Sequence, residues 1–178
     1  MNDITIVAGF EIPSTNPLFL AVVLAVHTPL GLVCVVVGIF AMFSKKQRGR
    51  HSTLGTTYFW CLLALVISAT FLSAMRWNES YHLFVIGVCS FAAAWFGRSA
   101  LRQRWPFWPR LHITGMGVSY LLMLIAFYVD NGKQLPIWRE LPHFTYWLLP
   151  LIVGIPLIVR ALLWHSLAQE PTRKPGGR

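Results

Sequence analysis

The fold is decided by residues 18–43, which read LFLAVVLAVHTPLGLVCVVVGIFAMF and contain no formal charge. A helix of this length rises about 39 Å, which exceeds the roughly 30 Å hydrocarbon layer of a bilayer. We therefore predict a membrane-spanning helix. His27 lies roughly 13 Å along it, where an imidazole is costly without a partner and is a functional candidate. Pro29 removes the N–H that the carbonyl of Ala25 would accept, so the helix should open or kink beside His27.

The composition extends this prediction to the whole chain. The 178 residues are 56% hydrophobic and 12% charged, against about a quarter charged in soluble domains. We expect an all-α polytopic membrane protein, a bundle of five transmembrane helices with a four-helix core plus one. Residues 1–16 are predicted to be an extracytoplasmic lead, with residues 4–10 on the membrane surface, and residues 166–178 a disordered basic cytoplasmic tail. The transmembrane domain takes up residues 17–165, with spans at about 18–43, 54–75, 81–97, 111–129 and 144–164.

The distribution of charge predicts the orientation. The net charge is +9, and apart from Arg76, Lys133 and Arg139 the 15 Lys and Arg lie on one side: 11 follow the first, third or fifth span, and Arg160 lies near the end of the fifth. Five of the six acidic residues fall on the opposite side. The positive-inside rule then places the N-terminus outside and the C-terminus in the cytoplasm. Basic residues arranged in this way indicate contact with the lipid bilayer, and we expect no nucleic-acid partner.

The histidines sort by depth in this topology. His51 precedes the second span and His112 begins the fourth, both at the inner boundary, whereas His27 and His82 belong to the outer half of the first and third spans. Alternate helices of an antiparallel four-helix bundle lie across the bundle from each other, which suits a planar cofactor between two axial imidazoles. The arrangement is similar to that of cytochrome b561-type proteins. This resemblance implies an inner haem b between His51 and His112, an outer one between His27 and His82, and electron transfer within or across the membrane.

Other interpretations of these residues stay open. His27, His82 and His143 could hold copper or another metal ion, since imidazole is a common ligand. The histidines could also serve only packing and lipid contact, in a non-catalytic accessory or assembly subunit of a larger membrane complex. Neither a paired set of carboxylates nor an activated nucleophile is evident within the spans, so the sequence leaves open whether the protein is an enzyme.

The order of these features also resembles the bacterial membrane-protein family called domain of unknown function 2306. The resemblance is carried by the following residues: His27, Gly31 and Gly38; Gly49, Arg50, His51, Gly55 and Tyr58; His112, Gly115, Met116 and Gly117; and the run AFYVDNG at residues 126–132. It implies a multi-pass protein of the bacterial inner membrane and draws attention to His27, His51 and His112. It implies no particular activity.

Overall fold

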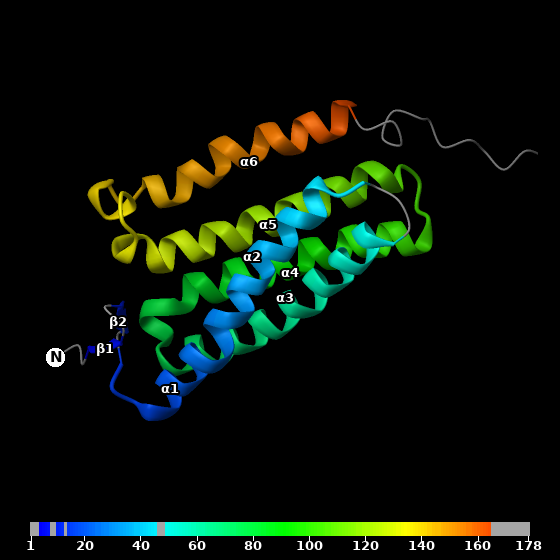
Figure 1. Ribbon diagram of the computed structural model, residues 1–178. Helices are drawn as coiled ribbons and strands as arrows, with labels where there is room; N and C mark the ends of the chain where they lie inside the picture. Colours follow the sequence, from blue (N-terminus) through cyan, green and yellow to red (C-terminus); the bar gives the residue numbers. More distant parts are fainter. Residues whose placement is uncertain (1–3, 8–9, 13, 46–48, 165–178) are drawn as a thin grey trace, which may run out of the picture.

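Five long helices form the structure, a computed structural model that describes residues 4–7, 10–12, 14–45 and 49–164 (Figure 1). Within these residues, five helices are long and apolar enough to cross a membrane. The predicted all-α polytopic bundle is therefore confirmed. In chain order, the helical segments are α1 (Pro17–Val22), the π-helical η1 (Val23–His27), α2 (Thr28–Phe43), α3 (Arg50–Met75), α4 (Trp77–Gln103), α5 (Trp108–Asn131), the short 3-10 helices η2 (Gly132–Gln134) and η3 (Trp138–Glu140), and α6 (Thr145–Trp164).

The first span contains the irregularity expected from its proline. α1, η1 and α2 form one continuous helix, and the π-helical η1 ends at His27, two residues before Pro29. Thr28 donates its N–H to the carbonyl of Val23, one residue farther back than in an α-helix. A missing proline N–H disturbs the i to i−4 ladder, and short π-helical turns in α-helices frequently lie at functional sites.

The third span is longer than predicted. The sequence analysis gave it residues 81–97, whereas α4 begins at Trp77 and runs for 27 residues. Arg76 alone separates α3 from α4, with φ −137° and ψ 48°. Glu79 lies in the first turn of α4 and pairs with Arg76, and a carboxylate there is favoured by the helix dipole. The polar residues that were assigned to a connection therefore begin a helix.

The N-terminal lead contains a small hairpin that the sequence analysis missed. Strand β1 (Thr5–Val7) pairs antiparallel with β2 (Phe10–Ile12), with Thr5 opposite Ile12. Ile12 is buried against Phe19 and Leu72. Gln134, in the connection between α5 and α6, accepts from the N–H of Glu11 at 2.8 Å and donates to its carbonyl at 3.0 Å. The hairpin is thus attached to this end of the bundle rather than only to a membrane surface.

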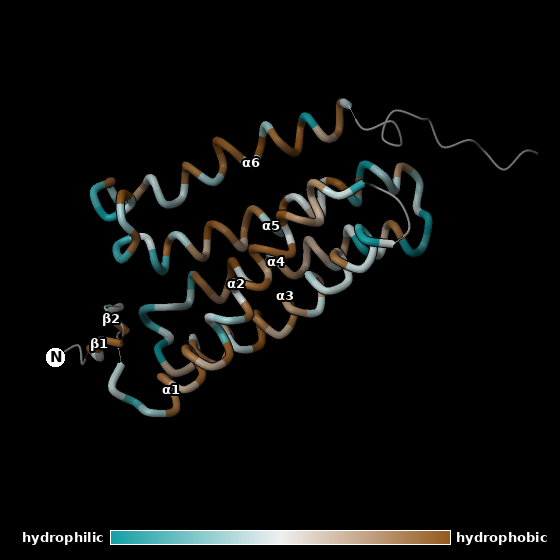
Figure 2. The backbone as a smooth tube through the Cα atoms, viewed as in Figure 1, coloured by the Kyte–Doolittle hydropathy of each residue, from teal (hydrophilic) through white to brown (hydrophobic). Residues whose placement is uncertain are grey.

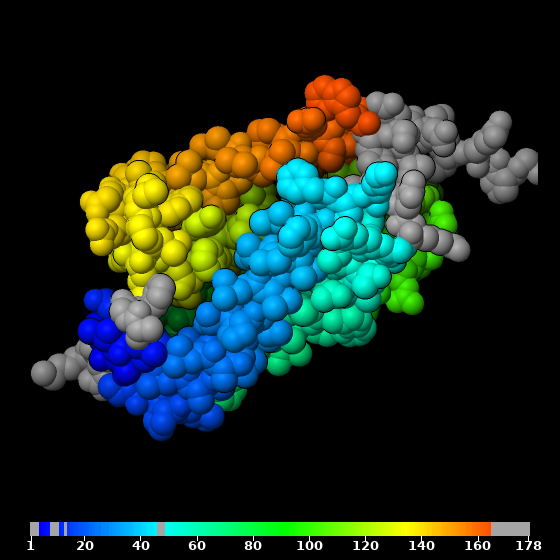
Figure 3. Space-filling model, viewed as in Figure 1, coloured from blue at the N-terminus to red at the C-terminus, as the bar shows by residue number. Residues whose placement is uncertain are grey.

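The core lies between α2, α3, α4 and α5. Consecutive helices pack side by side, and α6 packs mainly against α5, so it is the additional helix beside a four-helix core. Figure 3 shows α6 and α2 as separate ridges with part of α5 visible between them. The central buried side chains are Cys34, Tyr58, Phe59, Leu62, Leu65, Ala94, Tyr120 and Met123. Figure 2 shows apolar residues along the middle of the helices and polar residues at both ends of the bundle.

Hydrogen bonds between helices connect this core. The Tyr58 hydroxyl lies 3.0 Å from that of Ser119, and Ser90 donates to the Ser119 carbonyl at 2.8 Å. Tyr120 donates to the carbonyl of Val35 at 3.0 Å. In a membrane, where burial of apolar surface does not drive helices together, such bonds and close packing are the main sources of association. They hold α2, α3, α4 and α5 at defined positions.

Candidate functional site: a pair of histidines

The structure brings His51 and His112 together at the end of the bundle that carries the basic connections. His51 is the second residue of α3 and His112 the fifth of α5. Their ring centroids are 6.5 Å apart, and the ring planes are nearly perpendicular, at 86°. Both side chains are half-buried. The predicted inner pair is therefore formed by two helices that face each other across the core.

Each ring is oriented by a backbone carbonyl of a further helix. Nδ1 of His51 lies 2.9 Å from the carbonyl oxygen of Ala41 in α2, and Nδ1 of His112 lies 3.1 Å from that of Gly97 in α4. A carbonyl oxygen can only accept, so the proton of each neutral ring is on Nδ1 and the lone pair on Nε2. Metal-binding histidines are typically oriented by such a bond.

The separation of the rings fits two ligands of one metal atom. Metal–imidazole nitrogen bonds are about 2.0 Å long, so two imidazoles on opposite sides of one ion have centroids roughly 6 Å apart. The observed 6.5 Å is close to this value. Gly55 lies one helical turn after His51 on the same face of α3, and a Cβ placed there would have no neighbouring atom within 4 Å. The donor set and the separation of the ring centroids are thus compatible with a bis-imidazole site.

The tight contact of α4 with α5 positions His112. A Cβ at Gly115 would lie 2.7 Å from Cα of Gly97 and 2.8 Å from the carbonyl oxygen of Ala93. The backbones of α4 and α5 can approach this closely because Gly97 and Gly115 have no side chains. This approach places the Gly97 carbonyl within hydrogen-bonding distance of His112.

The structure places the two outer histidines on different partners. The His27 ring nitrogen Nδ1 lies 3.0 Å from the hydroxyl of Ser68 in α3. The His82 ring lies 5.7 Å from Tyr81 and 6.5 Å from Trp147 of α6, centroid to centroid. Between these two described histidines the structure records no ring contact. An outer haem between them therefore stays a prediction.

The alternative metal site is not assembled. His143 contacts Tyr146, with ring centroids 5.2 Å apart, while His27 and His82 have the separate partners given above. Across the part of the chain that the structure describes, no three His, Cys, Asp or Glu side chains gather closely enough to hold a metal ion. The copper-type site predicted at His27, His82 and His143 is thus not formed in this structure, because its histidines have different neighbours.

Ser68 is the polar partner that the sequence analysis did not identify. It is 6% exposed, and its hydroxyl also donates to the carbonyl of Leu65 at 2.8 Å. A serine inside an apolar span is the signal that could have pointed to it. His27 in the first span is thus hydrogen-bonded to α3, and its functional role stays a prediction.

Comparison with known proteins adds no relative. No protein-family model matches this chain, and neither a curated protein nor a solved structure is significantly similar to it.

Proposed function

We propose that His51 and His112 would hold one haem b through their imidazole nitrogens, and that the protein carries electrons in the membrane. The proposal is carried by one observation: two rings 6.5 Å apart whose Nδ1 atoms both face backbone carbonyls. When bound, haem supplies a one-electron redox couple. The proposal concerns a multi-pass protein of a bacterial inner membrane, with this site near the cytoplasmic face, as the family resemblance and the positive-inside rule predict.

The protein's own contribution is to orient the two ligands. The carbonyls of Ala41 and Gly97 hold the imidazole planes and increase the basicity of Nε2, which is the atom that would bind iron. The four contributing groups come from α2, α3, α4 and α5, so the core determines the site.

The optical spectrum of purified protein tests this proposal. We expect protein from haem-replete cells to show a Soret band and sharp visible bands on reduction. His51→Ala and His112→Ala should each weaken haem binding at least roughly tenfold, since even the loss of groups that only orient metal ligands costs about ten- to hundredfold. His143→Ala is the matched control, because this exposed residue lies at the other end of the bundle and should leave the spectrum unchanged.

Two results would contradict the proposal. One is a colourless wild-type protein that does not take up added hemin. The other is full haem binding by the His51→Ala and His112→Ala variants. If His82→Ala abolished the spectrum while both of these variants retained it, the outer pair would be the site.

A second candidate function, that of an accessory or assembly subunit, is favoured by the exposure of the first and fifth spans. In each span we consider the 18 consecutive residues that are most apolar. Only 6% of these residues are buried in Pro17–Phe43 and in Thr145–Trp164, against 28–33% in the three other spans. Such faces suit contact with other subunits as well as lipid. A non-catalytic accessory or assembly subunit would co-purify with a larger complex, and its assembly would not depend on His51 and His112.

A further inference from the structure

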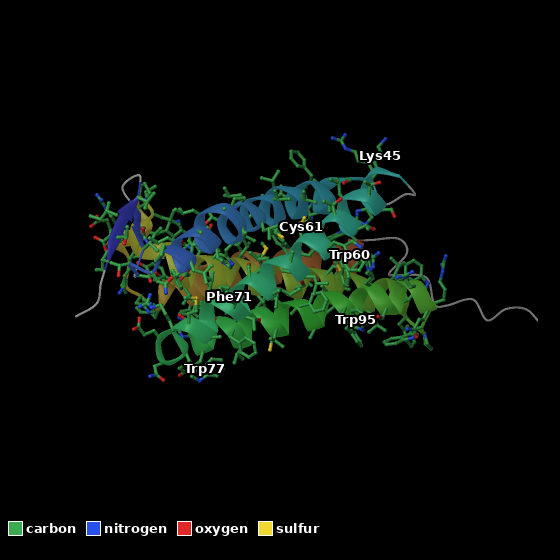
Figure 4. The ribbon with its side chains drawn as sticks, turned by 90° about the horizontal axis from the view of Figure 1, so that it is seen from below. Lys45, Trp60, Cys61, Phe71, Trp77 and Trp95 are labelled. Atoms are coloured by element: carbon green, nitrogen blue, oxygen red, sulfur yellow. The ribbon has the colours of Figure 1, made fainter. Side chains whose placement is uncertain are left out.

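A cleft of about 320 Å³ lies between α3 and α4, on the outer surface of the bundle near its basic end. Phe59, 3% exposed, is the most buried of its lining residues, whereas Trp60 and Trp95 are 58% and 59% exposed. Figure 4 shows Trp60 on α3 and Trp95 on α4 in the half of the molecule that contains Lys45. The remaining lining residues are Arg98, Ser99, Arg102 and Gln103. An apolar part and a cationic part therefore adjoin in one cleft.

Arg98 is held in place by the cleft itself. Its Cζ atom lies 4.7 Å from the centroid of the Phe59 ring, and Nη1 donates to the Thr56 hydroxyl at 3.3 Å. A guanidinium over an aromatic face is stabilised by a cation–π interaction and keeps donors for further bonds. Arg102 follows one helical turn later and is exposed. The two guanidinium groups thus belong to one face of α4.

No carboxylate neutralises this pair among the described residues. The two ion pairs recorded there are Arg76–Glu79 and Arg139–Glu140. Glu79 lies at the opposite end of α4, about 28 Å from Arg98 along the axis at 1.5 Å per residue. The one acid on the predicted cytoplasmic side, Glu170, is outside the described residues. The cleft therefore carries positive charge that an anion can balance.

The depth of the cleft matches the level of lipid phosphates. The 27 residues of α4 span about 40 Å, which exceeds the roughly 30 Å hydrocarbon layer by about 5 Å at each end. Arg98 lies about 8 Å from the last residue, Gln103, at the boundary between hydrocarbon and headgroups. By the same count, Trp95 lies about 12 Å from the last residue of α4 and Trp60 about 15 Å from the first residue of α3, so both rings lie deeper than Arg98, at the level of the acyl chains.

We propose that this cleft binds one anionic glycerophospholipid. The phosphate interacts with Arg98 and Arg102, and one acyl chain lies against Trp60 and Trp95. Arginine suits phosphate because its planar fork can donate two hydrogen bonds to it. The apolar walls distinguish a lipid from a free phosphate ion, which would use only the cationic part. Basic pockets between transmembrane helices are known binding sites for anionic headgroups. This inference is independent of the proposed haem site.

Native mass spectrometry of the purified full-length protein tests the assignment. The probes are phosphatidylglycerol and phosphatidylcholine with identical acyl chains. We expect wild-type protein to retain one phosphatidylglycerol with roughly tenfold or greater preference, because two arginines near the membrane surface attract the anionic headgroup. The Arg98→Gln, Arg102→Gln double variant should lose this preference. Lys45→Gln with Arg104→Gln is the matched control, because it removes two exposed charges at the same end but outside the cleft.

Further arms separate this proposal from its alternatives. Excess inorganic phosphate should not displace the lipid. In a separate experiment, phosphatidylglycerol with brominated acyl chains should quench the tryptophan fluorescence of the wild-type protein more than brominated phosphatidylcholine does. Because Arg98 contacts Phe59, its replacement could unfold the protein, so Arg102→Gln alone is the second variant and should reduce the preference severalfold. Equal retention of both lipids by wild-type protein, an undiminished preference in both cleft variants, or full displacement by phosphate would overturn the proposal.

Discussion

Replacing Gly115 with alanine should destabilise the bundle and loosen the histidine pair. The added methyl group would lie 2.7 Å from Cα of Gly97 and 2.8 Å from the carbonyl oxygen of Ala93. Both neighbours are backbone atoms, so no side-chain rotation relieves the contact. Ordinary van der Waals contact begins near 3.4 Å, and the helices must therefore separate by about 0.7 Å at this point. Overpacking of this kind typically costs about 1–3 kcal/mol.

The same separation affects His112. Its Nδ1 lies 3.1 Å from the carbonyl oxygen of Gly97, and an added 0.7 Å along this direction gives roughly 3.8 Å, which is too long for a hydrogen bond. We therefore expect Gly115→Ala to weaken haem binding although it removes no ligand. The loss should be smaller than that of His112→Ala, because the imidazole itself is retained.

The assay is reversible unfolding in mixed micelles, with helical circular dichroism as the signal. Gly55→Ala is the matched control, because the same methyl group there meets no atom within 4 Å. In a helix, alanine is favoured over glycine by about 0.5–1 kcal/mol, so Gly55→Ala should be neutral or stabilising. We expect the two variants to differ by about 2 kcal/mol or more. A Gly115→Ala variant as stable as Gly55→Ala would refute the reasoning that backbone contact limits the approach of α4 and α5.

Two further predictions concern hydrogen bonds between spans. Tyr58→Phe and Ser119→Ala should each lower the free energy of unfolding by about 1–3 kcal/mol, since each leaves a buried hydroxyl unpaired. The double variant should lose less than the sum of the two single losses. Strict additivity in the unfolding assay would contradict the 3.0 Å bond between the two hydroxyls. His27→Ala and Ser68→Ala should be coupled by roughly 0.6 kcal/mol, the average for such pairs in membranes, and a double-mutant cycle without coupling would show that their 3.0 Å contact contributes nothing.

The class of fold could be predicted from composition alone, because the bilayer constrains each membrane-spanning segment separately. A continuous apolar run of about 17–25 residues has the length that a helix needs to cross about 30 Å of hydrocarbon, so the run at residues 18–43 and the four later runs could be recognised without knowing their neighbours. Pro29 likewise predicted an irregular helix, since the loss of its N–H is a local effect. Helix ends that consist of polar residues are harder to predict from sequence. Residues 77–80 were expected to belong to a connection, whereas they form the first turn of α4.

Which histidines meet could not be predicted from any single span, because it depends on how the helices pack. Depth along a span follows from counting residues, but the direction of a side chain depends on helix rotation and on how closely neighbours approach. Gly97 and Gly115 bring α4 and α5 into backbone contact, and this contact places a carbonyl beside His112. His27 at the end of the π-helical turn is directed instead to Ser68. Pairing across a bundle therefore depends on packing between segments far apart in the chain, which the pattern of any one segment does not contain.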